Sequence, residues 1–553
     1  MSDPAQSEIA LRLVDRYWDD LLEIEPILAT EVGDERYDDR LPDPSEDGRE
    51  HRRQTHGAAL AALATIDTAA VDPTLRGTLD VLEAICRRDL ANIEARMDRL
   101  EVISHLGGPG QLLGVLASLQ RADTPERLER YLRRLGAVPA YVDAVIPTME
   151  EGTRLGVTVP DVVADRSIAQ VERLLAAGAE GSPALTPAGD DPDARGRVAD
   201  IVKDAVLPAY GRYLDALRAY RPHATETIGL SALPDGDRLY AAQILAWTTL
   251  PLDAREVHEL GRQELAGIQA ERREIAKSLG HAGPEEAIAD YEASGRAFAS
   301  SREEMVRIAE DQVQRGWNAA PSFFGRMPEA NCQVRPVEEY REQDMPFAFY
   351  MSPTADGSRA GIYYVNTSDL SERPLHHLAT TTYHEANPGH HLQVSIEQEL
   401  PERPQLRRFG GFLAGSAFGE GWGLYSERLA DEMGLFVDEY ERLGMLDAQG
   451  MRAARLIVDT GIHALGWNRE RSIAQMVEAG VAKLDAEIET DRYIAMPGQA
   501  LSYKIGQREI ERWRRDAAER DGAAFDLKAF HDHLLSLGSL PLPALRREMG
   551  SDG

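Results

Sequence analysis

The residues of this chain best suited to chemistry stand together at positions 383–393. The segment reads Tyr-His-Glu-Ala-Asn-Pro-Gly-His-His-Leu-Gln, so His384 and Glu385 are adjacent, and His390 and His391 follow shortly after. Imidazole nitrogens and carboxylate oxygens are common ligands of zinc and related metals. A carboxylate beside such a metal can instead act as a general base. The segment therefore predicts a catalytic metal site.

The spacing of the histidines departs from the common zinc motif His-Glu-x-x-His. In that motif the two histidines are about 40° and 6 Å apart on a helix, so both imidazoles reach one metal. On an ideal helix His390 would lie roughly 9 Å and about 120° from His384, and His391 about 10.5 Å away near the same face. Pro388 and Gly389 interrupt helices, and a bulge there can bring a second histidine to chelating distance. These residues alone leave both histidines as candidates.

A third ligand is expected from the segment at 411–433. It reads GFLAGSAFGEGWGLYSERLADEM and carries Glu420 and Glu427 seven positions apart, on one face of a predicted helix. Glu420 lies among Gly, Ala and Phe, where a buried carboxylate is costly unless a cation or metal pairs with it. Two histidines, one glutamate and an open position make a catalytic zinc site. The competing interpretation is a His-Glu pair on a solvated helix face.

Helices are expected to position most of these residues, and the predicted fold class is mainly α. Apolar residues return at spacings of three and four from Ile9 to Ile27 and in many later segments. A small β-hairpin is predicted where 346–353 and 360–367 carry β-branched and aromatic residues around a turn at 354–360. The further predicted helices are Ala59–Ile66, Thr78–Leu100, Thr124–Gly152, Val159–Ala177, Gly196–Tyr220, Asp253–Leu279 and Arg302–Gly316.

Composition and charge exclude several classes of protein. The chain has 553 residues, of which 43% are hydrophobic and 28% charged, which excludes disordered and fibrous classes. A net charge of -32 opposes binding to nucleic acid. The two cysteines, Cys86 and Cys332, are too few for a disulfide framework. Neither a signal peptide nor an apolar span of about 20 residues is seen, so a cytoplasmic protein without membrane contact is expected.

Several blocks of the sequence resemble one bacterial family, the domain of unknown function 885. The resemblance runs from about Leu11 to Arg546. Its blocks are His384-Glu385-x-x-Pro388-Gly389-His390-His391-Leu392-Gln393, Glu420-Gly421-Trp422, Leu233-Pro234-x-Gly236-x-x-x-Tyr240, Glu259-Leu260-Gly261, Tyr363-Tyr364-Val365-Asn366-Thr367, Asp459-x-Gly461-x-His463 and Pro497-Gly498-Gln499-Ala500-x-Ser502-Tyr503-Lys504-Ile505-Gly506.

That family looks related to the gluzincin zinc metallopeptidases, which include helical oligopeptidases and angiotensin-converting enzyme. The resemblance implies a large, two-lobed, helical metallopeptidase-like fold with a small sheet beside the active-site cleft. It also implies an N-terminal helical lobe at 1–230 and a catalytic region at 231–553, as parts of one family domain whose lobes can interleave.

The resemblance further implies roles for the residues of the metal motif. One Zn²⁺ per chain would be held by His384, His390 and Glu420, with Glu385 as the general base. His390 is favoured because a Gly-His pair closes the shorter motif in several of those relatives. His391 remains the alternative ligand.

Other expected site residues lie outside the motif. Tyr503 is expected to donate a hydrogen bond to the tetrahedral intermediate, with His463 as another candidate. Gln499 and Lys504 are expected to bind the C-terminal carboxylate of a substrate. Asn366 is expected at the end of an edge strand that pairs with the substrate backbone.

The expected function is zinc-dependent hydrolysis of peptide bonds in short peptides. Exopeptidase action, as by a carboxypeptidase or dipeptidase, is favoured over endopeptidase action. One alternative is a metal-dependent hydrolase of a non-peptide amide metabolite, and another is a non-catalytic helical binding protein. Glu385 argues against the latter, because a structural metal site needs no base. The expected partner is a short peptide or small amide, and the oligomeric state stays open.

Overall fold

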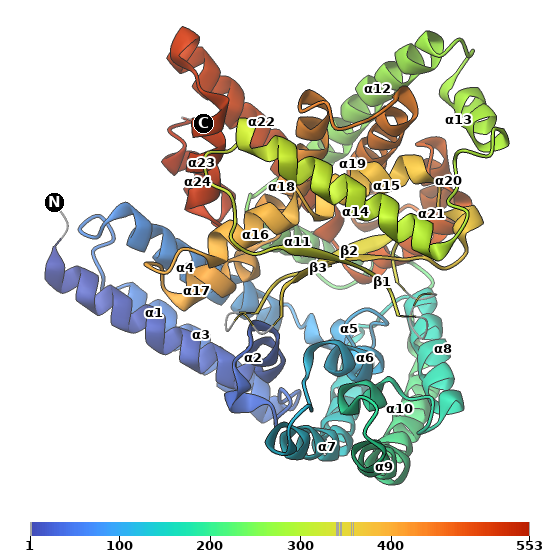
Figure 1. The fold of residues 1–553 in the computed structure, drawn as a ribbon. Coiled ribbons are helices and arrows are strands. Elements are labelled where there is room, and N and C mark those ends of the chain that lie inside the picture. Colours follow the sequence, from blue (N-terminus) through green and yellow to red (C-terminus); the bar gives the residue numbers. More distant parts are fainter. Residues whose placement is uncertain (1–2, 339–341, 343–344, 355–356, 358, 552–553) are drawn as a thin grey trace.

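The computed structural model of the chain describes residues 3–338, 342, 345–354, 357 and 359–551. Helices make up 71% of the chain and strands 3%, so the predicted mainly α fold class is confirmed. A small sheet crosses the middle of the molecule, and α14 (Arg302–Ala319) packs against it (Figure 1). Within the described part of the chain, no helix is long and apolar enough to span a membrane.

The N-terminal part of the chain, as far as Tyr220, consists of helices joined by turns and loops. Several begin at a proline that follows a capping Asp or Thr. The Asp72 side chain, for example, accepts a hydrogen bond from the N–H of Leu75. The helices are α1 (Pro4–Ile24), α2 (Pro26–Val32), α3 (Glu46–Leu63), α4 (Pro73–Glu94), α5 (Asp98–Glu101), α6 (Pro109–Leu119), α7 (Pro125–Leu155), α8 (Asp161–Ala177), α9 (Pro192–Ile201) and α10 (Leu207–Tyr220).

The C-terminal half supplies the helices that carry the motif residues. Every helix predicted from apolar spacing overlaps an observed helix, although Ala59–Ile66 covers only the end of α3. The helices are α11 (Gly236–Thr248), α12 (Ala254–Ser278), α13 (Pro284–Ala293), α14, α15 (Leu375–Glu385), α16 (His390–Gln398), α17 (Gln405–Phe409), α18 (Ala417–Glu432), α19 (Glu439–His463), α20 (Arg469–Glu478), α21 (Lys483–Ala495), α22 (Ser502–Asp521), α23 (Leu527–Leu537) and α24 (Leu542–Glu548).

The sheet has three strands in the order β1-β3-β2. The antiparallel pair β2 (Ala348–Met351) and β3 (Gly361–Val365) is the predicted hairpin, whose turn at 354–360 lies partly outside the described residues. The third strand, β1 (Cys332–Pro336), is not predicted by the sequence pattern and pairs in parallel with β3. The expectation of an edge strand at 361–367 is wrong, because β1 and β2 occupy both edges of β3. The backbone of β3 is therefore not available to pair with a substrate.

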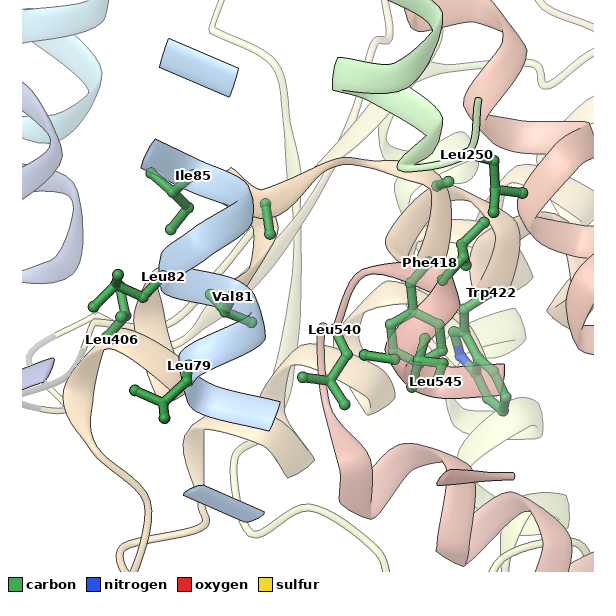
Figure 2. Packing of buried hydrophobic residues seen from close by; sticks show 14 of the residues in the cluster. Leu79, Val81, Leu82, Ile85, Leu250, Leu406, Phe418, Trp422, Leu540 and Leu545 are labelled. Carbon is green, nitrogen blue, oxygen red and sulfur yellow. The ribbon is translucent and has the colours of Figure 1, made fainter. Parts of the chain in front are cut away.

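Two large apolar cores hold the helices together. The first joins α1 and α4 to α18, α22 and the last helices, and the second joins α6–α10 to α19–α21. Figure 2 shows part of the first core, with Leu82 of α4 near Leu406 and Phe418 of α18 near Leu545. Both cores contain residues from each side of position 230, so the two expected regions share their packing.

Candidate metal centre

A break between two helices shapes the metal motif. α15 ends at Glu385 and α16 begins at His390, so residues 386–389 leave the helical path. The imidazole rings of His384 and His390 consequently lie 4.8 Å apart between centroids, at an angle of 89°. A straight helix would separate these residues by about 9 Å along its axis. The predicted interruption at Pro388 and Gly389 is therefore confirmed.

Contacts with α18 and a lack of space fix the geometry of this break. The indole Nε1 of the fully buried Trp422 donates a hydrogen bond to the carbonyl oxygen of Pro388, at 3.0 Å. A Cβ atom on Gly389 would lie only 1.9 Å from the carbonyl oxygen of His384, so a glycine is required here. The path of the chain thus depends on a segment more than thirty residues away.

Three side chains with metal-ligating atoms converge at the break. Nε2 of His384 lies 3.8 Å from Oε2 of Glu420, and Nε2 of His390 lies 3.7 Å from the same oxygen. Ligand atoms 2.0–2.1 Å from a tetrahedral zinc ion are about 3.4 Å apart. The donor set and its spacing therefore fit zinc with a small adjustment. The side chains of His390 and Glu420 are 17% and 23% exposed, so the cluster opens to solvent.

Glu427 orients His384 from the buried side of the cluster. Its Oε1 accepts a hydrogen bond from Nδ1 of His384 at 2.8 Å, which leaves Nε2 facing Glu420. Its Oε2 accepts a hydrogen bond from Nε2 of Gln449 at 3.0 Å. Such a partner behind the imidazole is usual for metal-binding histidines. Glu427 could be found from the sequence because it lies seven positions after Glu420, on the same helix face. Nothing in the sequence singles out Gln449.

Burial and pairing shift the pKa values of the cluster when no metal is bound. Burial lowers the pKa of His384, but the carboxylates of Glu420 and Glu427 outweigh it and raise the pKa to about 10. Burial raises the pKa of Glu420, but the two imidazoles hold it well below its usual value. Burial also raises the pKa of Glu385, and here the histidines offset it only in part. A raised pKa suits a group that takes up and returns a proton near neutrality.

The geometry separates the two candidate histidines. His391 is fully buried, and its Nε2 donates a hydrogen bond to the carbonyl oxygen of Ala330 at 3.0 Å. Its Nδ1 lies 3.0 Å from the hydroxyl of Tyr350 on β2. His390 is the histidine that faces Glu420, whereas both ring nitrogens of His391 have partners near the sheet.

Two further expected site residues, Tyr503 and Gln499, are linked to each other by Arg492, and Tyr503 lies beside the cluster. The Tyr503 ring is 6.5 Å from the His384 ring between centroids and nearly parallel to it, at 28°. Nη2 of Arg492 donates to the Tyr503 hydroxyl at 3.3 Å and to Oε1 of Gln499 at 2.7 Å. Arg492 itself was not anticipated from the sequence.

The structure corrects the expectation for Lys504. This side chain is only 2% exposed, and its ammonium donates hydrogen bonds to Oε1 of Gln449 at 2.9 Å and of Gln507 at 2.6 Å. Burial lowers the pKa of Lys504 to about 8. The ammonium lies behind Glu427, because Gln449 bonds both residues, so it does not face a substrate.

His463 and Asn366 are likewise used within the protein. Nδ1 of the buried His463 accepts a hydrogen bond from the N–H of Leu230, and Nε2 donates to the carbonyl oxygen of Tyr493. The amide nitrogen of Asn366 donates to the carbonyl oxygens of residues 342, 345 and 346, and its oxygen accepts from Ser368. These partners are supplied by the fold itself, so we do not include either residue among the substrate contacts.

A second grouping of His376, His377 and Asp447 also brings three ligand atoms within 4.8 Å of one another. There, Nε of the buried Arg272 lies 2.8 Å from Oδ1 of Asp447 and neutralises it. Within the described residues, Glu420 has only imidazoles as partners. The grouping around Glu420 is therefore the better candidate for a metal centre.

Comparisons with known proteins identify the family of the chain. The model of a family described as "Bacterial protein of unknown function (DUF885)" matches residues 26–549. The chain belongs to this family. The family assignment made from the sequence motifs is thereby confirmed. No curated protein matches the chain significantly.

Two solved structures resemble this one over nearly their whole length. "The crystal structure of the putative lipoprotein from Colwellia psychrerythraea" is 27% identical, with a TM-score of 0.91 and 99% of both chains covered. "The structure of a putative lipoprotein of unknown function from Shewanella oneidensis" is 20% identical, with a TM-score of 0.74, and covers 98% of this chain and 99% of its own. The second likeness shows the fold alone.

Proposed function

We propose that this DUF885 protein is a zinc-dependent hydrolase of the gluzincin type that cleaves peptide bonds in short peptides. The observation that carries the proposal is the convergence of His384, His390 and Glu420, with Glu385 next to the first ligand. A structural zinc site would close its coordination with a fourth protein ligand. At this site three of the described residues converge with no fourth ligand beside them, and two of the three are partly exposed to solvent.

The chain's own residues supply the ligands that the proposed metal needs. His384 and His390 would bind it through Nε2, and Glu420 through its carboxylate. When bound, Zn²⁺ polarises a scissile carbonyl and lowers the pKa of a bound water towards neutrality. Glu427 keeps the proton of His384 on Nδ1, which leaves Nε2 free as a ligand.

Two residues would handle the proton and the developing charge. Glu385, at the end of α15, takes a proton from the attacking water and returns it to the leaving amine. Tyr503, whose ring lies beside His384, donates a hydrogen bond to the oxyanion of the tetrahedral intermediate. The reaction needs no covalent intermediate with the protein. The cytoplasmic location expected from the sequence stays a prediction, to be checked by cell fractionation.

Metal analysis tests the site first. Protein purified without a chelator would be analysed by mass spectrometry as wild type and as His384→Ala, His390→Ala, His391→Ala and Glu420→Ala. We expect one zinc per chain in the wild type and in His391→Ala, and loss of zinc in the other three. A wild type that binds no metal, even after addition of zinc, would contradict the proposal.

Turnover tests the mechanism. Zinc-loaded wild type and Glu385→Gln would be compared on a library of dipeptides and tripeptides. Loss of a general base is expected to lower the rate about 10²- to 10⁴-fold at unchanged zinc content. Retained activity in Glu385→Gln would contradict the role of Glu385. Hydrolysis of other amides but no peptides would favour the metabolite hydrolase, and zinc binding without any hydrolysis would favour a binding protein.

A further inference from the structure

A group of three arginines stands next to the proposed metal centre. Arg452 and Arg455 from α19 and Arg492 from α21, here called the arginine cluster, meet around Tyr503. The Cζ atoms of Arg455 and Arg452 lie 4.4 Å and 5.8 Å from the centroid of the Tyr503 ring. Because that ring is 6.5 Å from the ring of His384, one aromatic side chain separates the cluster from a proposed zinc ligand.

One carboxylate serves two of these arginines. Nη2 of Arg455 lies 2.8 Å from Oε2 of Glu489, and Nη1 of Arg492 lies 3.4 Å from Oε1 of the same carboxylate. The two guanidinium groups hold the pKa of Glu489 at about 2 against the effect of burial, which raises it. The side chain of Arg492 is 25% exposed, so the cluster reaches solvent.

Arg452 adds a third positive charge without a close counter-ion. Within the described part of the chain, no carboxylate oxygen lies within 4.0 Å of its guanidinium, which is the distance limit for an ion pair. The polar contacts of its Nη1 are long, at 3.4 Å to the carbonyl oxygen of Ala448 and 4.0 Å to the sulfur of Met451. Its Cζ lies 5.8 Å from the centroid of the Tyr503 ring, which stands beside His384. Arg452 therefore stands near the reacting groups with its charge only partly balanced.

Two donor nitrogens of this cluster are buried without an acceptor. They are Nε of Arg452 and Nη1 of Arg455, and neither has a hydrogen-bond partner among the described residues. Arg455 as a whole is only 4% exposed. Since the two arginines are three positions apart on α19, they lie on the same face of the helix and can bind one ligand together.

We propose that the arginine cluster binds a carboxylate of the substrate, with Arg452 and Arg455 as the principal donors. Arginine matches a carboxylate with paired, charge-assisted hydrogen bonds. The inference rests on the proposed hydrolysis and names its substrate class, peptides with a free C-terminal carboxylate. An extended residue spans at most about 3.6 Å, so a peptide anchored here presents one of its last few peptide bonds to the metal centre.

This assignment replaces the one that the sequence suggested. Lys504 was expected to bind the carboxylate, but its ammonium is held inside the protein by Gln449 and Gln507. Gln499 keeps a part, because its side-chain oxygen accepts a hydrogen bond from Arg492 and so orients that guanidinium.

The test measures binding to protein from which EDTA has removed metal, so that zinc cannot itself take the carboxylate. N-acetylated tri-alanine with a free C-terminal carboxylate and the same peptide as its C-terminal amide are each titrated by calorimetry. We expect the acid to bind about 10- to 100-fold more tightly than the amide. Arg452→Gln, which removes one of the two principal donors, should lower this preference. The control Arg428→Gln, which breaks an ion pair with Glu271 elsewhere, should retain it.

Equal affinity of the wild type for acid and amide would overturn the proposal, as would no binding of either peptide at millimolar concentration. A full preference retained in Arg452→Gln would overturn it as well. The comparison of the two peptides on the wild type needs no variant, so it decides the matter even where a variant folds poorly. The titration uses neither metal nor turnover, so its failure leaves the zinc and hydrolysis experiments to judge the proposed function separately.

Discussion

A single methyl group at Gly423 tests the geometry of the metal centre most directly. Gly423 lies on α18 between Glu420 and Glu427, and a Cβ atom there would lie 2.7 Å from Nε2 of His384 and 3.0 Å from Cε1 of His390. Ordinary contacts of a Cβ begin at 3.4 Å, so in Gly423→Ala the Cβ and the His384 ring must move apart, by about 0.7 Å to reach such a contact. Metal sites tolerate changes of about 0.2 Å in ligand distance. Zinc binding should therefore be lost while the helix remains.

The size of the effect can be bounded from both sides. Alanine is favoured over glycine in a helix by about 1 kcal/mol, so Gly423→Ala should not lower the stability of α18 itself. Changing a partner behind a metal ligand typically costs 10- to 100-fold in affinity. Displacing the ligand atom should cost more, and we expect a loss of at least about 100-fold, equivalent to about 2.7 kcal/mol.

The matched control is Gly419→Ala on the same helix, because nothing lies within 4 Å of a Cβ at Gly419. Zinc affinity would be measured for both variants by competition with a chelator, and urea unfolding would be followed after EDTA treatment. We expect Gly419→Ala to bind zinc like the wild type and Gly423→Ala to bind it at least 100-fold more weakly, as estimated from the cost of ligand displacement. Equal zinc affinity in the two variants would refute the placement of Nε2 of His384 at the metal.

Three other substitutions test the surroundings of the site. Glu427→Gln keeps the shape behind His384 but removes the charge, so zinc affinity in chelator competition should fall about 10- to 100-fold, and an unchanged affinity would contradict this role. Burial lowers the pKa of His463 to about 4, so the imidazole binds a proton more tightly in the unfolded chain than in the folded one. The free energy of unfolding is therefore highest above pH 6.5 and falls as the pH is lowered from 6.5 towards 4. Between pH 7 and 5.5, the free energy of unfolding measured with urea should fall by about 1 kcal/mol more in the wild type than in His463→Gln. Equal decreases in the two proteins would disprove the burial argument. Trp422→Phe leaves the Pro388 carbonyl without its donor and should lower the free energy of unfolding by about 1–3 kcal/mol. A smaller loss together with normal zinc affinity would show that the break between α15 and α16 does not depend on this hydrogen bond.

The sequence by itself determined the fold class and pointed to most residues of the candidate metal centre. Apolar residues at spacings of three and four predict helices because the period is a property of each segment alone. His384, Glu385 and Glu420 stood out because ligand-type side chains were concentrated in short segments, one of them otherwise apolar. The β2–β3 hairpin was also foreseen, since its two strands are close in the sequence. The strand β1 was not, because CQVRP has no apolar run and its partner β3 follows 29 residues later.

Only the tertiary structure decided where the side chains point. His390 faces Glu420 and His391 faces the sheet because the chain leaves the helix at 386–389, a path held by Trp422 on α18. The same packing turned Lys504 into the interior and brought Arg452, Arg455 and Arg492 around Tyr503. Residue type and spacing define which chemistry is possible, but the direction of a side chain depends on contacts with segments distant in the sequence, and those contacts exist only in the folded protein.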